Sequence, residues 1–191
     1  MHDHEIIELC KKKRPEGFAR LLLTYQDAVY RQAFYFLRQR EDALDVTQDV
    51  FLRAFTAIDR FQSGRPIKPW LKKITLNLCL NLIRGRPAVA SLDEQFDRES
   101  ELTLGDSQSS TSDVVGEVEF RWLREEVDRA LDELPPLHRM TVLLRHKEGM
   151  SYEEIAGTLG LPLGTVKTYL FRARRHMKDR LGPYLSAGGD R

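Results

Sequence analysis

The sequence predicts an all-α protein with two small helical domains joined by an acidic linker. Over several long stretches, apolar residues recur at intervals of three and four, which is the periodicity of amphipathic helices. No long stretch alternates apolar and polar residues, as half-exposed strands do. Residues 87–118 have neither pattern and are rich in Ser, Asp, Glu and Gly, so we expect a linker there. The length of 191 residues, 41% of them hydrophobic, suits two small domains.

The first domain is expected at residues 1–86 and holds three helices. Apolar residues at helical spacing place these helices at residues 18–37, 42–61 and 68–84. The apolar positions of the first helix are Phe18, Leu21, Leu22, Tyr25, Val29, Ala33, Phe36 and Leu37. Residues that break helices follow the second and third helices, at Gly64, Pro66, Gly85 and Pro87.

The start of the chain gives weaker signals. His2, Asp3 and His4 have the composition of a loose metal-binding set, but a frayed chain start is the favoured interpretation. Cys10 and Cys79 lie far apart and in no metal-binding spacing, so we expect reduced, buried or idle thiols, no metal site and no cofactor. No apolar run approaches the roughly 20 residues that span a bilayer, and the first residues lack a signal-peptide core. We therefore expect a cytoplasmic protein that is not inserted in a membrane.

Charge is divided unevenly along the chain. The formal net charge is +1, but residues 88–118 hold eight acidic residues against one basic residue, for a net −7, so the rest of the chain is +8. Residues 65–86 contain six basic residues and no acidic residue, and residues 167–180 contain six basic residues and one acidic residue. Two basic segments on predicted helices indicate contact with a polyanion at two places.

The second domain is expected at residues 119–185, followed by a tail at 186–191. A helical pattern over residues 119–133 stops at the Pro135-Pro136 pair, and another helix follows at 137–147. No motif in this domain or the first has the paired carboxylates, metal spacing or phosphate-binding glycine loop of an enzyme. We therefore expect no catalytic residues.

A helix-turn-helix is predicted near the carboxyl end. Ser151 and Glu154 have the spacing of a capping box, in which each side chain bonds the other residue's backbone amide. A short helix begins there, a turn follows at residues 160–162, and a long helix runs from about 164 to 181. In proteins with this motif the second helix enters the major groove of DNA.

The long helix has two distinct faces. Its expected core face holds Val166, Leu170, Ala173, Met177 and Leu181. The other side holds Lys167, Thr168, Phe171, Arg172, Arg175 and Lys178. An aromatic residue among cations suits packing on a thymine methyl or a sugar while its neighbours hold phosphates. The alternative is a solvated basic helix with Phe171 tucked under a neighbouring helix.

The third helix presents a polar wedge. The wedge holds Trp70, Lys73, Asn77, Asn81 and Arg84, whereas apolar residues occupy the other sides. Amides suit base edges, cations suit phosphates, and an indole suits an unstacked base. The alternative is that Trp70 belongs to the core and the asparagines are only solvated.

The second helix has a different outward side, with Asp45, Gln48, Asp49, Leu52 and Thr56. Ala43, Val50, Ala54, Ile58 and Phe61 lie on other sides as packing candidates. The outward side is not basic, and a leucine among polar residues suits a protein partner.

Three segments, in this order and with an acidic linker before the last, carry a resemblance to a known family. They are Asp42-Ala-Leu-Asp-Val-Thr-Gln-Asp49 with its continuation to Phe61, Pro69-Trp-Leu-Lys-Lys-Ile-Thr-Leu-Asn77 to Arg84, and Leu134-Pro-Pro-Leu-His-Arg139 with the helix-turn-helix through Gly164-Thr-Val-Lys-Thr-Tyr-Leu-Phe-Arg-Ala-Arg174. From about residue 18 to 181 the chain resembles the extracytoplasmic-function (ECF) sigma factors of the sigma-70 family. Tyr169, where many members have arginine, Thr47, and the prolines in residues 62–69 depart from the usual pattern.

The resemblance implies a factor that gives RNA polymerase its promoter specificity. It implies docking on the clamp helices of the polymerase largest subunit through Asp45, Gln48, Asp49, Leu52 and Arg53. It implies contacts to the −10 promoter element through Phe61, Lys73, Asn77, Asn81 and Arg84, with a flipped base held by the loop at residues 61–68. It implies contacts to the −35 element through Lys167, Thr168, Tyr169, Phe171, Arg172, Arg175 and Lys178. It also implies an anti-sigma partner, which in this family is often membrane-bound.

Two other function classes compete with this interpretation. A dimeric helix-turn-helix regulator would bind DNA without polymerase, and it would not need the polar wedge of Lys73, Asn77 and Asn81. A recombinase or nuclease with an appended helix-turn-helix would need catalytic carboxylates or a metal site, for which the sequence gives no motif.

Overall fold

The computed structural model describes residues 3–85 and 117–187, with side chains described for 3–85 and 122–182. Every regular element in these ranges is helical, which confirms the predicted all-α class. The chain divides into two compact units, Met1–Arg86 and Pro87–Arg191. The acidic linker predicted at 87–118 lies almost wholly outside the described residues, and so does most of the tail at 186–191.

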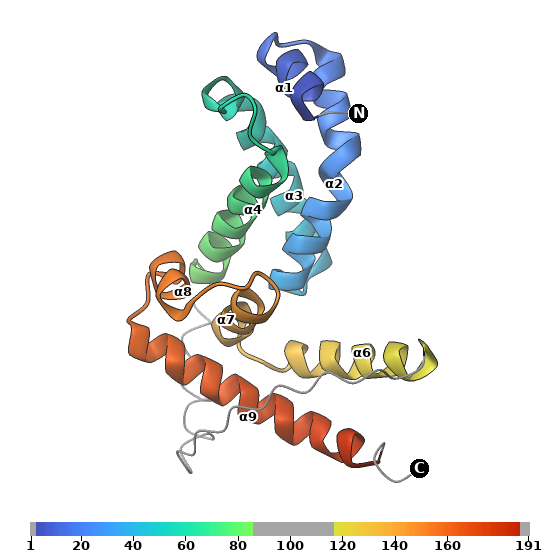
Figure 1. The fold of residues 1–191 in the computed structure, drawn as a ribbon, viewed down its shortest axis with the longest axis vertical. Coiled ribbons are helices and arrows are strands. Elements are labelled where there is room, and N and C mark those ends of the chain that lie inside the picture. Colours follow the sequence, from blue (N-terminus) through green and yellow to red (C-terminus); the bar gives the residue numbers. More distant parts are fainter. Residues whose placement is uncertain (1–2, 86–116, 188–191) are drawn as a thin grey trace. The chain divides into compact units, whose positions relative to one another are not determined.

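Within residues 3–85, the first unit contains four α-helices and one short 3-10 helix, and Figure 1 shows how they are arranged. They are α1 (Asp3–Lys11), α2 (Pro15–Leu37), α3 (Arg40–Ala57), η1 (Ile58–Arg60) and α4 (Ile67–Arg84). Helices α2, α3 and α4 pack against one another, and α1 packs on α2 and η1. The second expected helix therefore ends at Ala57, and a tighter turn replaces its last residues.

Helix α1 corrects the expectation of a frayed chain start. Ile6, Ile7 and Cys10 are spaced to share one face of a helix, and all three are buried. Gly17 of α2 permits this contact, because a Cβ atom there would lie only 2.7 Å from backbone atoms of Leu9 and Cys10. The short helix is thus stabilised by packing on α2 rather than by its own length.

The buried face of α2 follows the predicted periodicity except at two positions. In α2, Leu21, Tyr25, Val29, Ala33, Phe36 and Leu37 are buried as expected. Leu22 is instead 41% exposed and Phe18 is half-buried. Successive residues of a helix are 100° apart, and here that step carries Leu22 from the buried side of Leu21 into solvent.

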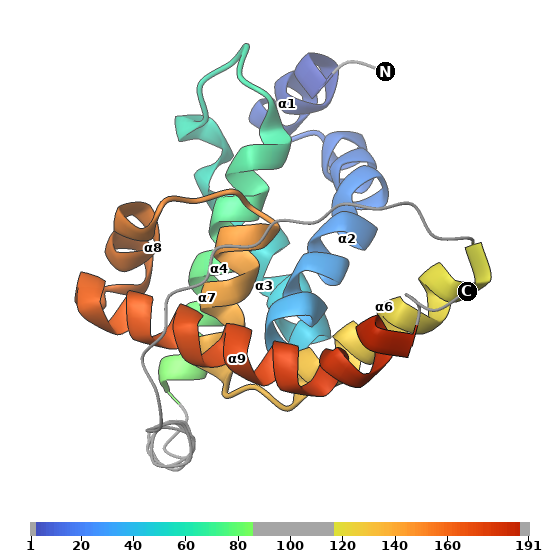
Figure 2. The same cartoon turned by 60° about the horizontal axis from the view of Figure 1, so that its bottom comes forward.

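The second unit contains α6 (Glu117–Asp132), α7 (Pro136–His146), α8 (Tyr152–Leu159) and α9 (Leu163–Ala187) (Figure 2). Helix α9 packs against each of the other three. It continues six residues beyond the expected end at Leu181, through Gly182 and Pro183, so these helix breakers did not end it.

Candidate protein and nucleic-acid interfaces

Helix α3 exposes the residues for which the family resemblance implies polymerase docking. Asp45, Gln48, Asp49, Leu52 and Arg53, which we call the α3 stripe, are all exposed. Leu52 is 64% exposed, which is a large fraction for a leucine. On the opposite side of the helix, Ala43, Val46, Val50 and Ala54 are buried against the rest of the unit. The stripe is therefore a surface held by a packed helix, with an apolar side chain among polar ones.

An apolar groove between α2 and α3 adjoins the α3 stripe, and sequence reasoning missed it. Phe18 and Leu22 of α2 and Phe51, Leu52 and Phe55 of α3 line it. The rings of Phe18 and Phe55 are 4.1 Å apart between centroids, and Phe55 is 44% exposed. The signal available was the Leu21-Leu22-Leu23 run, which is too wide for one buried face.

Helix α4 places its polar wedge in solvent. Lys73, Asn77, Asn81 and Arg84 are all exposed. Ile67, Leu71, Leu78, Cys79, Leu80 and Ile83 are buried on the other sides. Thr75 is also buried, and its hydroxyl donates to the carbonyl oxygen of Leu71 at 2.8 Å, so it occupies the core without an unmet hydrogen bond.

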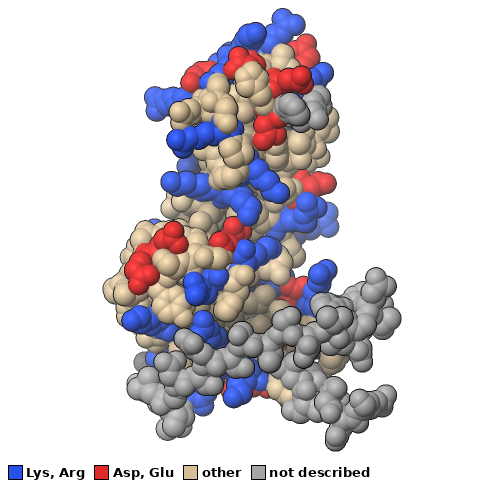
Figure 3. Space-filling view, in the orientation of Figure 1, with Lys and Arg blue, Asp and Glu red and all other residues tan. Residues whose placement is uncertain are grey.

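The charge of α4 is one-sided. The segment Ile67–Arg84 contains lysines and one arginine but no acidic residue. Figure 3 shows Lys and Arg side chains over this helix, whereas acidic side chains gather nearer α1. The exposed face of α4 therefore combines cations with amides, which is the composition that suits a nucleic-acid strand.

Phe61 and Trp70 form a ring pair at the start of α4. Their centroids are 4.9 Å apart, Phe61 is buried and Trp70 is half-buried. Phe61 therefore supports the connection between α3 and α4 from inside, and its contact with the −10 element stays a prediction. Residues 62–66, which follow Phe61 in the chain, are exposed. Among them Gly64 adopts a φ of 91° that favours glycine.

The helix-turn-helix has the predicted capping box. The Glu154 amide donates to the Ser151 hydroxyl at 3.1 Å, and the Ser151 amide donates to the Glu154 carboxylate at 2.7 Å. Helix α8 ends at Leu159, and the next residue, Gly160, caps it with a left-handed φ of 58°. The turn then leads directly into α9, so local sequence fixes the start and stop of α8.

Helix α9 buries Val166, Leu170 and Ala173, as predicted. The other two residues expected on that face, Met177 and Leu181, are only half-buried. On the other side Lys167, Thr168 and Lys178 are exposed, and Phe171, Arg172 and Arg175 are half-buried. Lys167 near the start of α9 and Lys178 farther along are thus the exposed cations of this set.

Tyr169 packs within the second unit. Its ring lies 4.0 Å from the ring of buried His138 in α7, and the side chain is half-buried. The sequence placed Tyr169 among the candidate DNA contacts. The ring pair ties α9 to α7, a pairing that the helical pattern of α9 alone does not reveal, and the DNA contact of Tyr169 stays a prediction.

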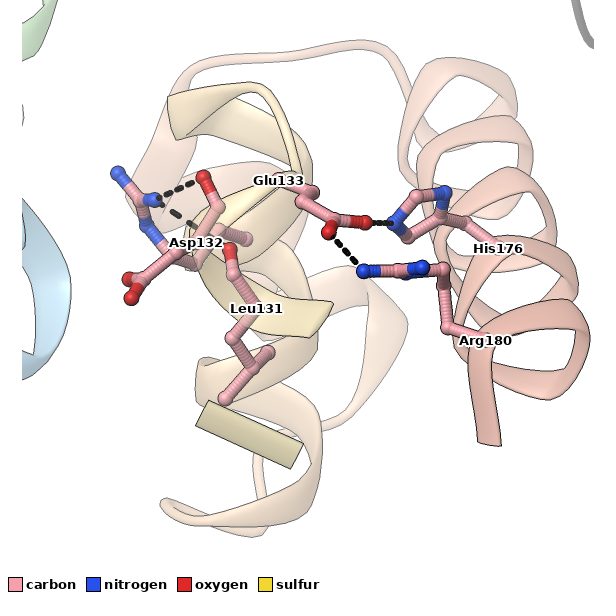
Figure 4. A network of polar contacts seen from close by, with 6 residues as sticks. Leu131, Asp132, Glu133, His176 and Arg180 are labelled. Atoms are coloured by element: carbon pink, nitrogen blue, oxygen red, sulfur yellow. Dashed lines mark hydrogen bonds and ion pairs between the residues drawn. The ribbon is translucent and has the colours of Figure 1, made fainter. Parts of the chain in front are cut away.

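A carboxylate holds α9 farther along its length (Figure 4). Glu133, just after α6, accepts from Arg180 and lies 3.1 Å from Nε2 of His176. In the same region Arg139 of α7 donates to the backbone carbonyl oxygens of Leu131 and Asp132. These contacts fix the junction of α6 and α7 against the second half of α9.

The two cysteines are buried free thiols, in agreement with the sequence prediction. Burial raises the pKa of the Cys79 thiol to about 12 and also raises the pKa of Cys10. Within residues 3–85 and 117–187, no group of three His, Cys, Asp or Glu side chains is placed to hold a metal ion. No helix in those ranges is long and apolar enough to cross a membrane.

Comparison with known proteins matches both units. The family model for sigma-70 region 2 matches residues 21–87, and the model for sigma-70 region 4 matches residues 124–177. The RNA polymerase sigma-H factor of Pseudomonas aeruginosa is 30% identical over 96% of this chain and 95% of its own length. The ECF RNA polymerase sigma factor SigW of Bacillus subtilis is 30% identical over 92% of this chain and 94% of its own length.

A third relative is longer than this chain. The ECF RNA polymerase sigma factor SigE of Mycolicibacterium smegmatis is 36% identical over 87% of this chain, which spans 62% of that relative. Among solved structures, CnrH in complex with the cytosolic domain of CnrY has a TM-score of 0.52 and 25% identity, covering 95% of this chain and 97% of CnrH. The sigma factor RpoE of Bartonella quintana, solved with the anti-sigma factor NepR, has a TM-score of 0.51 and 24% identity, covering 92% of this chain and 99% of that one.

Proposed function

The chain belongs to the ECF sigma factors of the sigma-70 family, and on that premise we propose how its surfaces divide the work of promoter-specific initiation. The first unit binds core RNA polymerase through α3 and the −10 element through α4. The second unit binds the −35 element through α9. The observation that carries this proposal is the contrast between the α3 stripe and the outward face of α4 within one unit.

The α3 stripe docks on the clamp helices of the polymerase largest subunit. Its acidic residues Asp45 and Asp49 flank the exposed apolar Leu52, a composition that suits a protein surface better than a phosphate backbone. Gln48 and Arg53 supply polar contacts at the edge of this surface.

The outward face of α4 binds the −10 element as a melted strand. Asn77 and Asn81 offer amides to base edges, while Lys73 and Arg84 offer cations to phosphates. The exposed connection at residues 62–66 and the half-buried Trp70 lie where an unstacked base would be held. Capture of such a base offsets the few kcal/mol that unstacking costs, so opening requires no enzymatic activity of this chain.

Helix α9 enters the major groove at the −35 element. Lys167 and Thr168 in its first turns are exposed and suit base or phosphate contacts, and Phe171 and Arg172 follow on the same side. Arg175 and Lys178 hold phosphates farther along. Tyr169 contributes through its packing on His138 rather than by direct reading.

The protein acts in the cytoplasm, where core polymerase transcribes, and an anti-sigma protein restrains it. The solved relative CnrH is bound to the cytosolic domain of CnrY, and this supports a partner of that kind. The exposed α3 stripe and the adjoining apolar groove are the surfaces that such a partner would have to cover to block polymerase.

Run-off transcription with purified core polymerase tests the proposal. The wild-type protein should start transcripts at defined sites. The double variant Asp49→Arg, Leu52→Ala should lose core binding by about 100-fold, because it reverses a charge and removes an apolar contact of the stripe. The double variant Asn77→Ala, Asn81→Ala should bind core normally but open promoters about tenfold less well.

Each variant is the control for the other, because both change exposed residues of the same unit. If the wild-type protein neither binds core nor directs initiation, yet binds duplex DNA tightly and specifically by itself, a dimeric helix-turn-helix regulator replaces this proposal. If both variants lose core binding equally, the assignment of polymerase binding to α3 and of −10 binding to α4 is wrong.

A further inference from the structure

Helix α1 contacts the connection between α3 and α4 through polar side chains. Nζ of Lys11 donates to the Ser63 hydroxyl at 2.6 Å, and that hydroxyl donates to the Glu8 carboxylate at 3.3 Å. Just beyond α1, Nζ of Lys13 lies 2.8 Å from the carboxylate of Asp59 in η1. Figures 1 and 2 both show α1 and this connection at the same end of the first unit. The match to the sigma-70 region 2 model begins at residue 21, after Glu8, Lys11 and Lys13.

Asp3 makes the contact that reaches α4 itself. One oxygen of its carboxylate accepts from the Tyr25 hydroxyl at 2.5 Å, and the other accepts from the backbone amide of Ile67 at 3.4 Å. Ile67 is the first residue of α4, and Pro66 before it has no polar side chain with which to cap the helix. A carboxylate at a helix start satisfies a free amide and interacts favourably with the helix dipole. Asp3 thus caps α4 from 64 residues away.

The position of Asp3 is fixed by packing. Tyr25 is buried, and its pKa is raised to about 12 by burial and by its hydrogen bond to Asp3, so the phenol stays protonated and keeps donating. Ile6 and Ile7 are buried, which anchors the helix that carries Asp3. The close approach at Gly17 leaves α1 little room to shift on α2.

We infer that α1 is a positioning element for the start of α4 and the connection before it, and that Asp3 is its principal positioning residue. The inference rests on the proposed function, in which this region holds the melted −10 strand. A site that captures a single base must be held within a fraction of an ångström by its supporting residues. Asp3 provides that support at the residue where α4 begins, whereas the α3 stripe lies on another helix and does not depend on it.

The test compares Asp3→Ala and Asp3→Asn with Glu5→Ala in the full-length protein. Glu5 is an exposed acidic residue in the first turn of the same helix, so its removal controls for charge loss near the chain start. Holoenzyme made with each variant is measured for core affinity and for opening of a promoter on which the wild type is active. We expect Asp3→Ala to reduce opening about tenfold, the scale of a lost helix cap, with core affinity unchanged within about twofold.

A second measurement separates positioning from general loss of structure. Holoenzyme is titrated with the single-stranded −10 oligonucleotide, intact or with one base removed at each position in turn. The wild type should prefer the intact base at one position, and Asp3→Ala should lose most of that preference. Asp3→Asn should fall between them, because its amide oxygen still accepts from the Ile67 amide, and Glu5→Ala should match the wild type.

The cap itself can be observed without polymerase. In NMR spectra of the free protein, the Ile67 amide resonance should move in Asp3→Ala relative to the wild type and stay in place in Glu5→Ala. An unmoved Ile67 amide, wild-type opening by Asp3→Ala, or an equal loss of core affinity and opening would each overturn the inference. If the wild-type protein fails to bind core or open any promoter, the proposed function fails and the inference falls with it, while the NMR comparison still decides whether Asp3 contacts α4.

Discussion

Helices α3 and α4 have the same length and pack in the same unit, yet their outward faces are chemically opposite. Each is an 18-residue helix with one buried apolar face. The outward face of α3 carries acidic residues around Leu52, whereas that of α4 carries cations and amides without an acidic residue. The inward residues of both helices form the core, while the outward residues give each helix its own surface chemistry.

The largest difference is expected between replacing a buried leucine of α4 and replacing an exposed leucine of α3, measured as the free energy of unfolding. Leu71 of α4 is 1% exposed, so Leu71→Ala should lower the free energy of unfolding by about 2–5 kcal/mol through lost burial and a residual cavity. The same change at Leu52 of α3, which is 64% exposed, should alter it by less than about 0.5 kcal/mol. Urea unfolding of both variants measures this. Equal losses of stability would contradict the different burial of these two leucines.

The buried thiol of Cys79 on the inward face of α4 should make the protein less stable at high pH. Cys79 has a pKa raised by burial from 9.0 to about 12 in the folded protein. Because the folded pKa exceeds the unfolded value, the stabilisation is complete below pH 9 and is lost as the pH rises toward 12. Denaturant unfolding between pH 8 and 11 should show the decline, and Cys79→Ala should make it shallower. An unchanged slope in that variant would assign the decline to other groups, such as Tyr25.

The positive charge on the outward face of α4 should make the affinity for a −10 strand depend on salt concentration. Lys73→Gln should reduce the slope of log affinity against log salt by about 0.7 for a single-stranded −10 oligonucleotide, since one phosphate contact is lost. Lys12→Gln, an exposed lysine beyond α1, is the matched control and should leave the slope unchanged. Fluorescence titrations of holoenzyme at several salt concentrations measure both. Equal slopes in the wild type and the Lys73 variant would remove Lys73 from the proposed DNA surface.

The smallest effect on stability is expected from the carboxylate of Glu133, which contacts α9 in the second unit. Asp3 holds α4 at its first residue, but Glu133 holds α9 in its second half, through His176 and Arg180. These three side chains are partly exposed, so Glu133→Gln should cost less than about 1 kcal/mol, and less at high salt. Thermal unfolding of this variant beside the control Glu125→Gln measures the effect. A loss of stability above about 2 kcal/mol would show that Glu133 stabilises the unit more than a partly exposed ion pair can.

The sequence was a good guide to the long helices and a poor guide to the chain start. Periodic apolar residues located α2, α3 and α4 to within a few residues and the start of α9 to within one, and the capping box located the start of α8. Helix α1 was missed because nine residues carry too little periodic signal to outweigh the fraying expected of a terminus. The roles of the candidate binding residues in polymerase and DNA contact stay predictions.

By itself, the sequence determined the helical class, the family and the division of each long helix into an inward and an outward face. It could do so because the 100° step of an α-helix is a local property, so spacing along the chain translates directly into direction. Tertiary structure alone decided that Leu22 is exposed beside a groove, that Tyr169 packs on His138, and that Asp3 caps α4. Those outcomes depend on which helices approach each other and how closely, and contacts between residues so far apart in the chain leave no periodic mark in the sequence.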